Sequence, residues 1–192
     1  CVTGVQTCAL PIYYPGVDLA YRPTNNWKVF ASWNKALRLP TFTDLFYKSP
    51  TQEGNQNLKP EKTEAYSVGV HYRTTGFRTE VSSFYQRGRD MIDWVMFYPE
   101  DVYHSTNFKL NSCGFDVSLN FLFSEWLANN NFLKQLSLQY AYISQTKKDE
   151  REIYKSNYAL EYLRHKFVGQ FSHRIYGALQ VSWSVRWQDR MG

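Results

Sequence analysis

Eight segments of the chain alternate apolar with polar residues, which is the pattern of β-strands that present one apolar face. In the clearest segment, Phe115, Val117 and Leu119 alternate with Asp116 and other polar or small residues. Tight turns such as Thr74-Thr75-Gly76 join neighbouring segments, so consecutive strands are expected to pair antiparallel. We predict an all-β fold, an antiparallel up-and-down sheet of about eight strands at residues 17–22, 27–35, 64–73, 77–87, 115–123, 136–142, 167–175 and 179–187.

The connections between these segments follow the order short, long, short, long, medium, long and short. The three long connections are expected at 37–61, 88–108 and 145–163. In an up-and-down sheet alternate connections lie at opposite rims, so the long ones all gather at one rim. Outer-membrane β-barrels have this arrangement, with short turns on one side and long loops on the other. A soluble β-sandwich gives no reason to sort its connections by length.

The polar face of the predicted strands is too large for a dry core. It carries His71, Asp116, Asn120, Gln180 and Arg186 together with many serines. Polar groups buried without partners are costly, so this face is expected to meet water. The apolar face then meets lipid, which makes the sheet a segment of a transmembrane β-barrel.

Composition supports a membrane strand protein and argues against two other classes. Aromatic residues make up 18% of the chain, and those at the predicted strand ends form two girdles at the membrane interfaces. Mean hydropathy is −0.51, and no run of ~18 apolar residues predicts a transmembrane helix. The net charge of +5 is spread along the chain rather than gathered in a basic stripe, so no nucleic-acid partner is expected.

The first residues have a different character from the rest. Residues 1–12, CVTGVQTCALPI, resemble the translation of a sequencing-adapter oligonucleotide, and we predict that they are an artefact and not native. Without Cys1 and Cys8 only Cys113 remains, which excludes an intrachain disulfide. The native part is then 13–192.

A long excursion, residues 37–61, separates the second and third predicted strands, and we name it the motif loop. Its prolines and Gly54 predict a loop without ladder strands, in which Thr43-Asp44 caps one helical turn at 45–47. Two groups of residues stand in it, Arg38, Pro40, Thr41, Phe42, Asp44, Leu45, Phe46 and Tyr47, then Gly54, Asn55, Asn57, Leu58, Lys59, Pro60 and Glu61.

In order and spacing, these two groups resemble a motif of TonB-dependent outer-membrane receptors. The resemblance implies a Gram-negative outer-membrane protein, embedded in outer-membrane lipid, that actively takes up a scarce large ligand of the cobalamin or ferric-siderophore class. It also implies a TonB-type energising protein that acts on a plug absent from this chain, so 13–192 are expected to be part of a larger receptor barrel, an incomplete one. Two alternatives remain open, a passive porin or structural barrel and a soluble β-sandwich carbohydrate-binding module.

Ligand contacts are expected on the long loops, because a rigid barrel holds loops in place for binding. The candidates are Arg38, Tyr47 and Lys48 in the motif loop, since cations and aromatic rings suit an anionic chelate. The second long loop adds Trp94, Phe97 and Tyr98. Phe42, Leu45 and Phe46 are instead expected to fold the motif loop onto the barrel wall or plug.

Catalysis is not expected. The four histidines His71, His104, His165 and His173 have no spacing typical of metal ligands, and none pairs with a candidate nucleophile. The carboxylates of the second loop, among them Asp90 and Asp101, are expected to be solvated. The sequence therefore predicts a binding protein with no metal and no cofactor.

Overall fold

The computed structural model describes residues 14–126, 132–148, 153–156, 162–177 and 179–191. The predicted adapter segment 1–12 lies outside this range. The eight long strands are β1 (Gly16–Tyr21), β2 (Trp27–Arg38), β5 (Glu61–Arg73), β6 (Phe77–Met96), β7 (Tyr103–Leu122), β8 (Leu133–Lys147), β10 (Leu163–Tyr176) and β11 (Leu179–Arg190). The short elements are α1 (Phe42–Phe46), β3 (Lys48–Ser49), β4 (Gln52–Glu53), α2 (Phe123–Trp126) and β9 (Lys155–Ser156).

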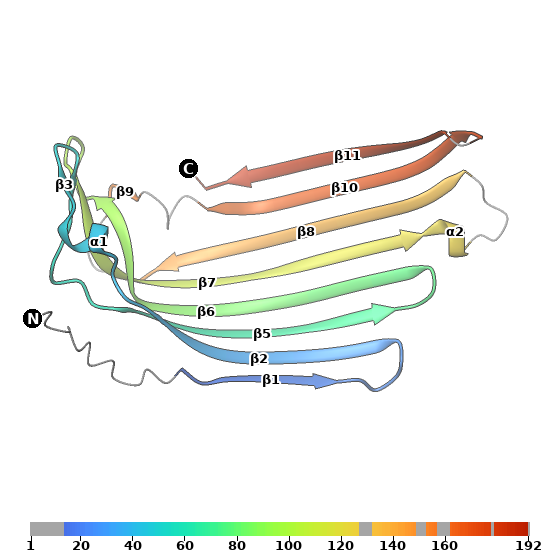
Figure 1. Cartoon of the computed structure of the whole chain (residues 1–192), viewed down its shortest axis with the longest axis horizontal. Helices are drawn as coiled ribbons and strands as arrows, with labels where there is room; N and C mark the ends of the chain where they lie inside the picture. The colour runs from blue at the N-terminus through green and yellow to red at the C-terminus, as the bar shows by residue number, and fades with distance from the viewer. Residues whose placement is uncertain (1–13, 127–131, 149–152, 157–161, 178, 192) are drawn as a thin grey trace, which may run out of the picture.

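The long strands form one antiparallel sheet in the order β1-β2-β5-β6-β7-β8-β10-β11, so each pairs with the next along the chain (Figure 1). This confirms the predicted all-β, up-and-down fold of about eight strands. The path runs from β1 to β11 without closing, as expected for an incomplete barrel. A single sheet also rules out the β-sandwich alternative. No helix in the described ranges is long and apolar enough to cross a membrane.

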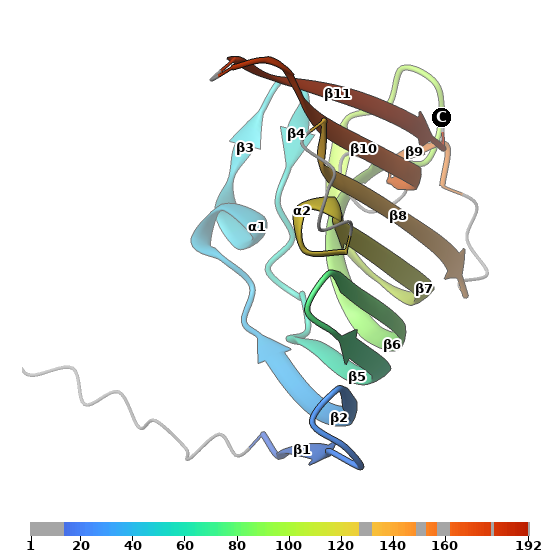
Figure 2. The same ribbon diagram turned by 90° about the vertical axis from the view of Figure 1, so that its right-hand side faces the viewer.

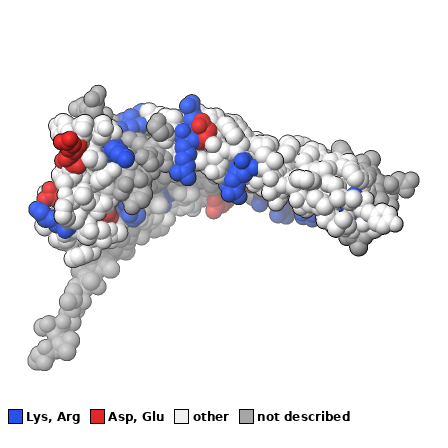
Figure 3. Space-filling model, turned by 90° about the horizontal axis from the view of Figure 1, so that it is seen from above, with Lys and Arg blue, Asp and Glu red and all other residues white. Residues whose placement is uncertain are grey.

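Two of the three predicted long connections, 39–60 and 148–162, lie at one rim as predicted, but the turn between β6 and β7 at that rim spans only 97–102. The elements α1, β3, β4 and β9 lie at one end of the sheet, and the short turns lie with α2 at the other (Figure 1). On the face seen in Figure 3, charged side chains lie mainly over the loop half, and the end with the short turns shows few.

The prediction of an irregular stretch at 88–108 is wrong. β6 continues to Met96 and β7 begins at Tyr103, so most of this stretch is a paired hairpin. A β-bulge between Gly88 and Met91 shifts the alternation of β6 by one residue, and Asp90 within it has a φ of 55°. The shift interrupts the period of two in the sequence while pairing resumes beyond it, which is why periodicity alone missed these strands.

The prediction of a motif loop without ladder strands is also wrong in part. The β2–β5 ladder extends to the pair Arg38 and Glu61, and β3 pairs with β4 inside the loop. Likewise β8 runs to Lys147, which shortens the third predicted loop, and β10 begins at Leu163, before the start of the predicted strand 167–175. Charged residues end the apolar alternation before pairing ends, because strands outside the membrane have no lipid-facing side.

The two faces of the sheet differ as predicted. The strands follow an arc in Figure 2, with α1, β3 and β4 on its concave side. Side chains on the outside of an arc spread apart, and along β6 the exposed positions include Val81, Tyr85 and Arg87 while the intervening residues are half-buried. Polar partners join strands on the other face, as in the Ser32–Ser67 hydroxyl pair at 2.6 Å. The apolar face therefore points outward, as expected for strands that form the wall of a β-barrel in lipid.

The core of the described chain lies at the loop end. Five apolar residues there are buried, Leu58, Trp94, Val95, Phe108 and Leu110. Leu58 comes from the motif loop and the others from the β6–β7 hairpin, so the loop and the hairpin tip form one packed unit.

Candidate functional site

An ion pair closes the base of the motif loop. Arg38 donates from Nε to Oε2 of Glu61 and from Nη2 to Oε1, both at 2.6 Å, in the bidentate geometry that makes such pairs strong. Oε1 of Glu61 also accepts from the backbone N–H of Ile92 at 2.7 Å. Glu61 is only 7% exposed, so this carboxylate joins β2, β5 and β6 from a buried position.

A capping box forms the helix of the motif loop. Thr41 is the N-cap of α1, its Oγ1 accepts from the N–H of Asp44, and the Asp44 carboxylate accepts from the N–H of Thr41. Two N–H groups at the start of the helix, those of Thr41 and Asp44, are thereby satisfied. The predicted helical turn exists, but it begins at Phe42 rather than Leu45 because Thr41, and not Thr43, caps it.

The two halves of the motif meet behind α1. Gly54 donates its N–H to the carbonyl of Tyr47 at 2.7 Å, and Asn55 donates to the carbonyl of Asp44 at 2.9 Å. The hydroxyl of Ser105, on β7, donates to the same Asp44 carbonyl at 2.6 Å. These contacts hold the two halves of the motif together, although they are separated in the sequence.

Asn107 on β7 anchors the second half of the loop to the hairpin. Its Oδ1 accepts from the N–H of Lys59 at 2.8 Å, and its Nδ2 donates to the carbonyls of Lys59 and Asp90 at 3.0 and 2.7 Å. Tyr103 adds a backbone bond to Thr51 at 2.9 Å. The sequence does not identify Asn107 as an anchor, because its position in a predicted irregular stretch gives no sign of a partner in the motif loop.

The Asn107→Asp variant is expected to loosen the motif loop at nearly unchanged shape. The carboxylate cannot donate, so two carbonyls lose their partner and face a negative charge, at a cost of about 1–3 kcal/mol. Hydrogen exchange of the Lys59 and Gly54 amides should accelerate. Asn120→Asp is the matched control, because Asn120 lies on the same strand far from the loop. Unchanged exchange in Asn107→Asp would contradict the anchoring role.

A polar hollow of about 490 Å³ lies between the motif loop and the hairpin tip. The motif loop lines it with Glu53, Gly54, Asn55, Gln56 and Asn57, and the hairpin lines it with Phe97, His104, Ser105 and Thr106. Side-chain amides, an imidazole and one aromatic ring converge here on the loop side of the sheet. This set can bind a polar ligand with a flat apolar part.

Charged groups at the rim of the hollow are fixed by short contacts. Lys48 donates to Glu53 at 3.0 Å, and this bond together with its charge lowers the pKa of the Glu53 carboxyl. Burial works to raise the pKa of Asp101, but hydrogen bonds from His104, Val102 and Phe97 outweigh it, and the net direction is down. His104 lies 3.3 Å from Asp101 and 3.8 Å from Glu53, so it connects the hairpin turn with β4.

The six predicted ligand contacts fall in three groups. Phe97 lines the hollow, and Lys48 lies at its rim through Glu53. Tyr47 and Tyr98 are 44% and 71% exposed, respectively, and neither lines the hollow. Arg38 and Trp94 are engaged within the protein, Arg38 with Glu61 and Trp94, 7% exposed, in an edge-on contact with Tyr47.

Phe42 and Phe46 do not pack on the described sheet, and their predicted contact with the barrel wall or plug stays a prediction. Their rings pair with each other at 4.9 Å on α1 and remain 78% and 49% exposed. A five-residue helix has too few positions to bury both its capping box and these rings, and Asp44 takes the buried side.

Comparison with known proteins gives a consistent result. A family model described as TonB dependent receptor-like, beta-barrel matches residues 11–191. The vitamin B12 transporter BtuB of Vibrio vulnificus (strain YJ016) is 30% identical over 91 residues, which is 47% of this chain and 14% of that protein. The chain thus spans about a seventh of the length of this relative.

Two solved structures share the fold at low sequence identity. The copper transporter OprC matches with a TM-score of 0.70 at 15% identity, covering 89% of this chain and 25% of that one. The siderophore receptor PirA from Pseudomonas aeruginosa matches with a TM-score of 0.62, also at 15% identity, covering 89% of this chain and 29% of that one.

Proposed function

Because the chain belongs to the TonB-dependent receptor β-barrel family, we propose that it forms part of an outer-membrane receptor that actively imports a scarce, large ligand. The hollow between the motif loop and the hairpin tip would hold part of that ligand. The observation that carries this proposal is the packing of the motif loop, which places five of its residues opposite Phe97 and His104 in one polar hollow at the loop end.

For the ligand we propose a cobalamin or a ferric siderophore. The relative with 30% identity is a vitamin B12 transporter, and one structural neighbour is a siderophore receptor. Both ligand classes combine a large polar periphery with flat conjugated or chelating groups. Such a surface suits the amides of Asn55, Gln56 and Asn57 beside the ring of Phe97.

Import against a gradient needs an energy source, and we propose a TonB-type periplasmic protein acting on a plug domain. The passive porin remains the competing function. The test is uptake of radiolabelled cyanocobalamin, or of a ferric siderophore, by cells that carry the receptor and lack their own. Uptake that stops when the TonB-type protein is deleted supports import, and uptake that continues unchanged supports a porin.

The Phe97→Ala variant is expected to weaken ligand binding about tenfold, which corresponds to loss of one aromatic contact. Gln56→Ala should add a smaller loss, because Gln56 is exposed and lines the same hollow. Tyr154→Ala is the control, since Tyr154 is 61% exposed but does not line the hollow. Equal affinities of all three variants and the native receptor would place the ligand elsewhere.

A further inference from the structure

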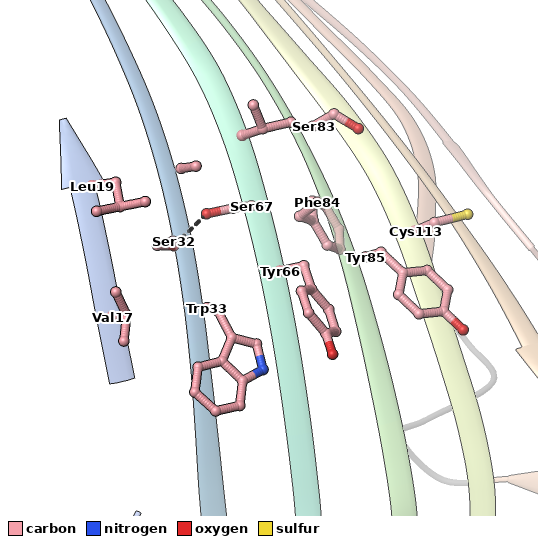
Figure 4. Close-up of a pocket in the computed structure, with 12 residues that line it drawn as sticks. Val17, Leu19, Ser32, Trp33, Tyr66, Ser67, Ser83, Phe84, Tyr85 and Cys113 are labelled. Atoms are coloured by element: carbon pink, nitrogen blue, oxygen red, sulfur yellow. Dashed lines mark hydrogen bonds between the residues drawn. The ribbon is translucent and has the colours of Figure 1, made fainter. Parts of the chain in front are cut away.

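Two hollows lie next to each other on the outward face of the sheet. The first has a volume of about 490 Å³, spans β1 to β7 and is lined mainly by apolar and aromatic side chains, among them Val17, Leu19, Trp33, Tyr66 and Tyr85 (Figure 4). The second, of about 450 Å³, is lined by Tyr85, Arg87, Gly88, Arg89, Lys109, Asn111 and Lys148. Tyr85 belongs to both, so an apolar hollow and a basic hollow share a wall.

The strand register places the basic hollow just above the aromatic girdle on the loop side. Trp33, Tyr66 and Tyr85 form one cross-strand row of that girdle. Arg87 follows Tyr85 by two residues, and residues two apart on a strand point to the same face. Arg87 therefore faces outward like Tyr85, and both side chains are exposed. The apolar hollow lies at membrane depth, and the basic hollow lies where headgroups begin.

Among the described residues, no carboxylate pairs with the cations of the basic hollow. Arg87, Arg89, Lys109 and Lys148 are all exposed, and none forms an ion pair with a carboxylate in the described part of the chain. Glu64, which is opposite Arg87 in the ladder, bonds instead to Trp33 at 3.1 Å and to Lys35 at 3.6 Å. Four like charges around one hollow repel one another, and an anion with several oxygens relieves that repulsion.

From this arrangement we propose that the two hollows together bind one phosphate-bearing, acylated lipid of the outer leaflet. Its phosphates lie among Arg87, Arg89, Lys109 and Lys148, and an acyl chain lies along Val17, Leu19 and Val68. The bulge at Gly88 bends β6 here, and this glycine lines the basic hollow between the two arginines. The inference depends on the outward direction of this face and not on which ligand the receptor imports.

A lipid fits this surface better than a free anion does. The basic hollow opens next to an apolar one on the same face, and a free phosphate has no apolar group that could fill the second hollow. The imported ligand is also a poor fit, because β4, whose Glu53 lines the ligand hollow, lies on the concave side of the sheet (Figure 2). Tyr85 lines both hollows, so the phosphates and an acyl chain of one amphiphile can lie on its two sides.

The experiment measures lipid retained by the receptor after purification from outer membranes in mild detergent. Native mass spectrometry counts bound lipid A-type glycolipid, and titration with added lipid A gives the affinity. We expect the variant with Arg87, Arg89, Lys109 and Lys148 all changed to Gln to bind at least tenfold more weakly than the native receptor. The control changes four exposed arginines at the short-turn rim, Arg22, Arg73, Arg78 and Arg174, to Gln and should retain native affinity.

Further measurements separate the sources of an anion and guard against misfolding. Dephosphorylated lipid A should bind the native receptor as weakly as lipid A binds the fourfold variant, and inorganic phosphate should not displace bound lipid at equal concentration. If the fourfold variant fails to assemble, the double variants Arg87→Gln/Arg89→Gln and Lys109→Gln/Lys148→Gln should each lose part of the affinity. Native-level lipid A binding in these variants, or displacement by inorganic phosphate, would overturn the proposal.

Discussion

The Glu61→Ala variant is expected to lower the free energy of unfolding by roughly 2–4 kcal/mol, a large effect for a single side chain. Glu61 is buried and accepts two bonds from Arg38 and one from Ile92, so alanine removes three charge-assisted bonds at once. Arg38 is half exposed and can turn to water, which keeps the cost below that of a fully buried broken pair. The backbone N–H of Ile92 cannot turn to water in this way.

Urea unfolding of the receptor in lipid vesicles, followed by tryptophan fluorescence, measures this cost. The Glu61→Gln variant separates shape from charge, since the amide keeps an acceptor for Ile92 but weakens the bond to Arg38. It should fall between native and alanine. Glu64→Gln is the matched control, because the Glu64 side chain is 27% exposed, against 9% for Glu61, and its partner Lys35 is 45% exposed. Pairs near the surface contribute about 0–1 kcal/mol. Equal losses at positions 61 and 64 would contradict the buried-anchor role of Glu61.

The Gly54→Ala variant is expected to open the motif loop and to reduce ligand affinity at least tenfold. A Cβ at this position would lie 3.0 Å from three backbone atoms, the carbonyl carbon of Leu45 and the nitrogens of Phe46 and Tyr47. Backbone cannot move aside as a flexible side chain can, so overpacking of about 1–3 kcal/mol falls on the contact that joins the two motif halves. The hollow beside Gly54 then loses its shape.

Limited proteolysis of intact cells and ligand titration test this result together. Cleavage within 37–61 should increase while the rest of the barrel stays resistant. Gly16→Ala is the control, since a Cβ there meets its nearest neighbours at 3.6 and 3.7 Å, an ordinary contact distance. A Gly54→Ala receptor with native affinity and native protease resistance would show that the close approach behind α1 is not needed.

The alternation of apolar and polar residues predicted the strands correctly where the two sides of a strand meet different environments. Strands within the membrane meet lipid on one side and water on the other, so their residues must alternate, and the eight segments and their order were predicted correctly. It failed at 88–108, where the bulge after Gly88 shifts the alternation and the hairpin extends beyond the lipid. Pairing there is maintained by backbone bonds, which leave no trace in side-chain polarity.

The candidate site was predictable only in outline. The motif residues identified the loop, and Phe97 was selected from the second loop on chemical grounds. Arg38 and Trp94 were selected for the same reasons, yet Arg38 is paired with Glu61 and the ring of Trp94 contacts Tyr47 edge-on. Asn107 and Ser105 hold the loop by hydrogen bonds to its backbone carbonyl and amide groups. Every residue has these backbone groups, so the sequence pattern of the loop does not indicate where such bonds form.

The sequence by itself determined the fold class, the outward apolar face and the family, because lipid imposes a period of two on every spanning strand and the motif loop carries specific residues. Tertiary structure alone decided which residues meet between segments far apart in the chain. It placed the motif loop on the β6–β7 hairpin, formed the polar hollow between them, and brought Arg87, Arg89, Lys109 and Lys148 around one hollow beside Tyr85. Strand register, bulges and backbone hydrogen bonds determine these long-range contacts. All three depend on the three-dimensional geometry rather than on the order of residues.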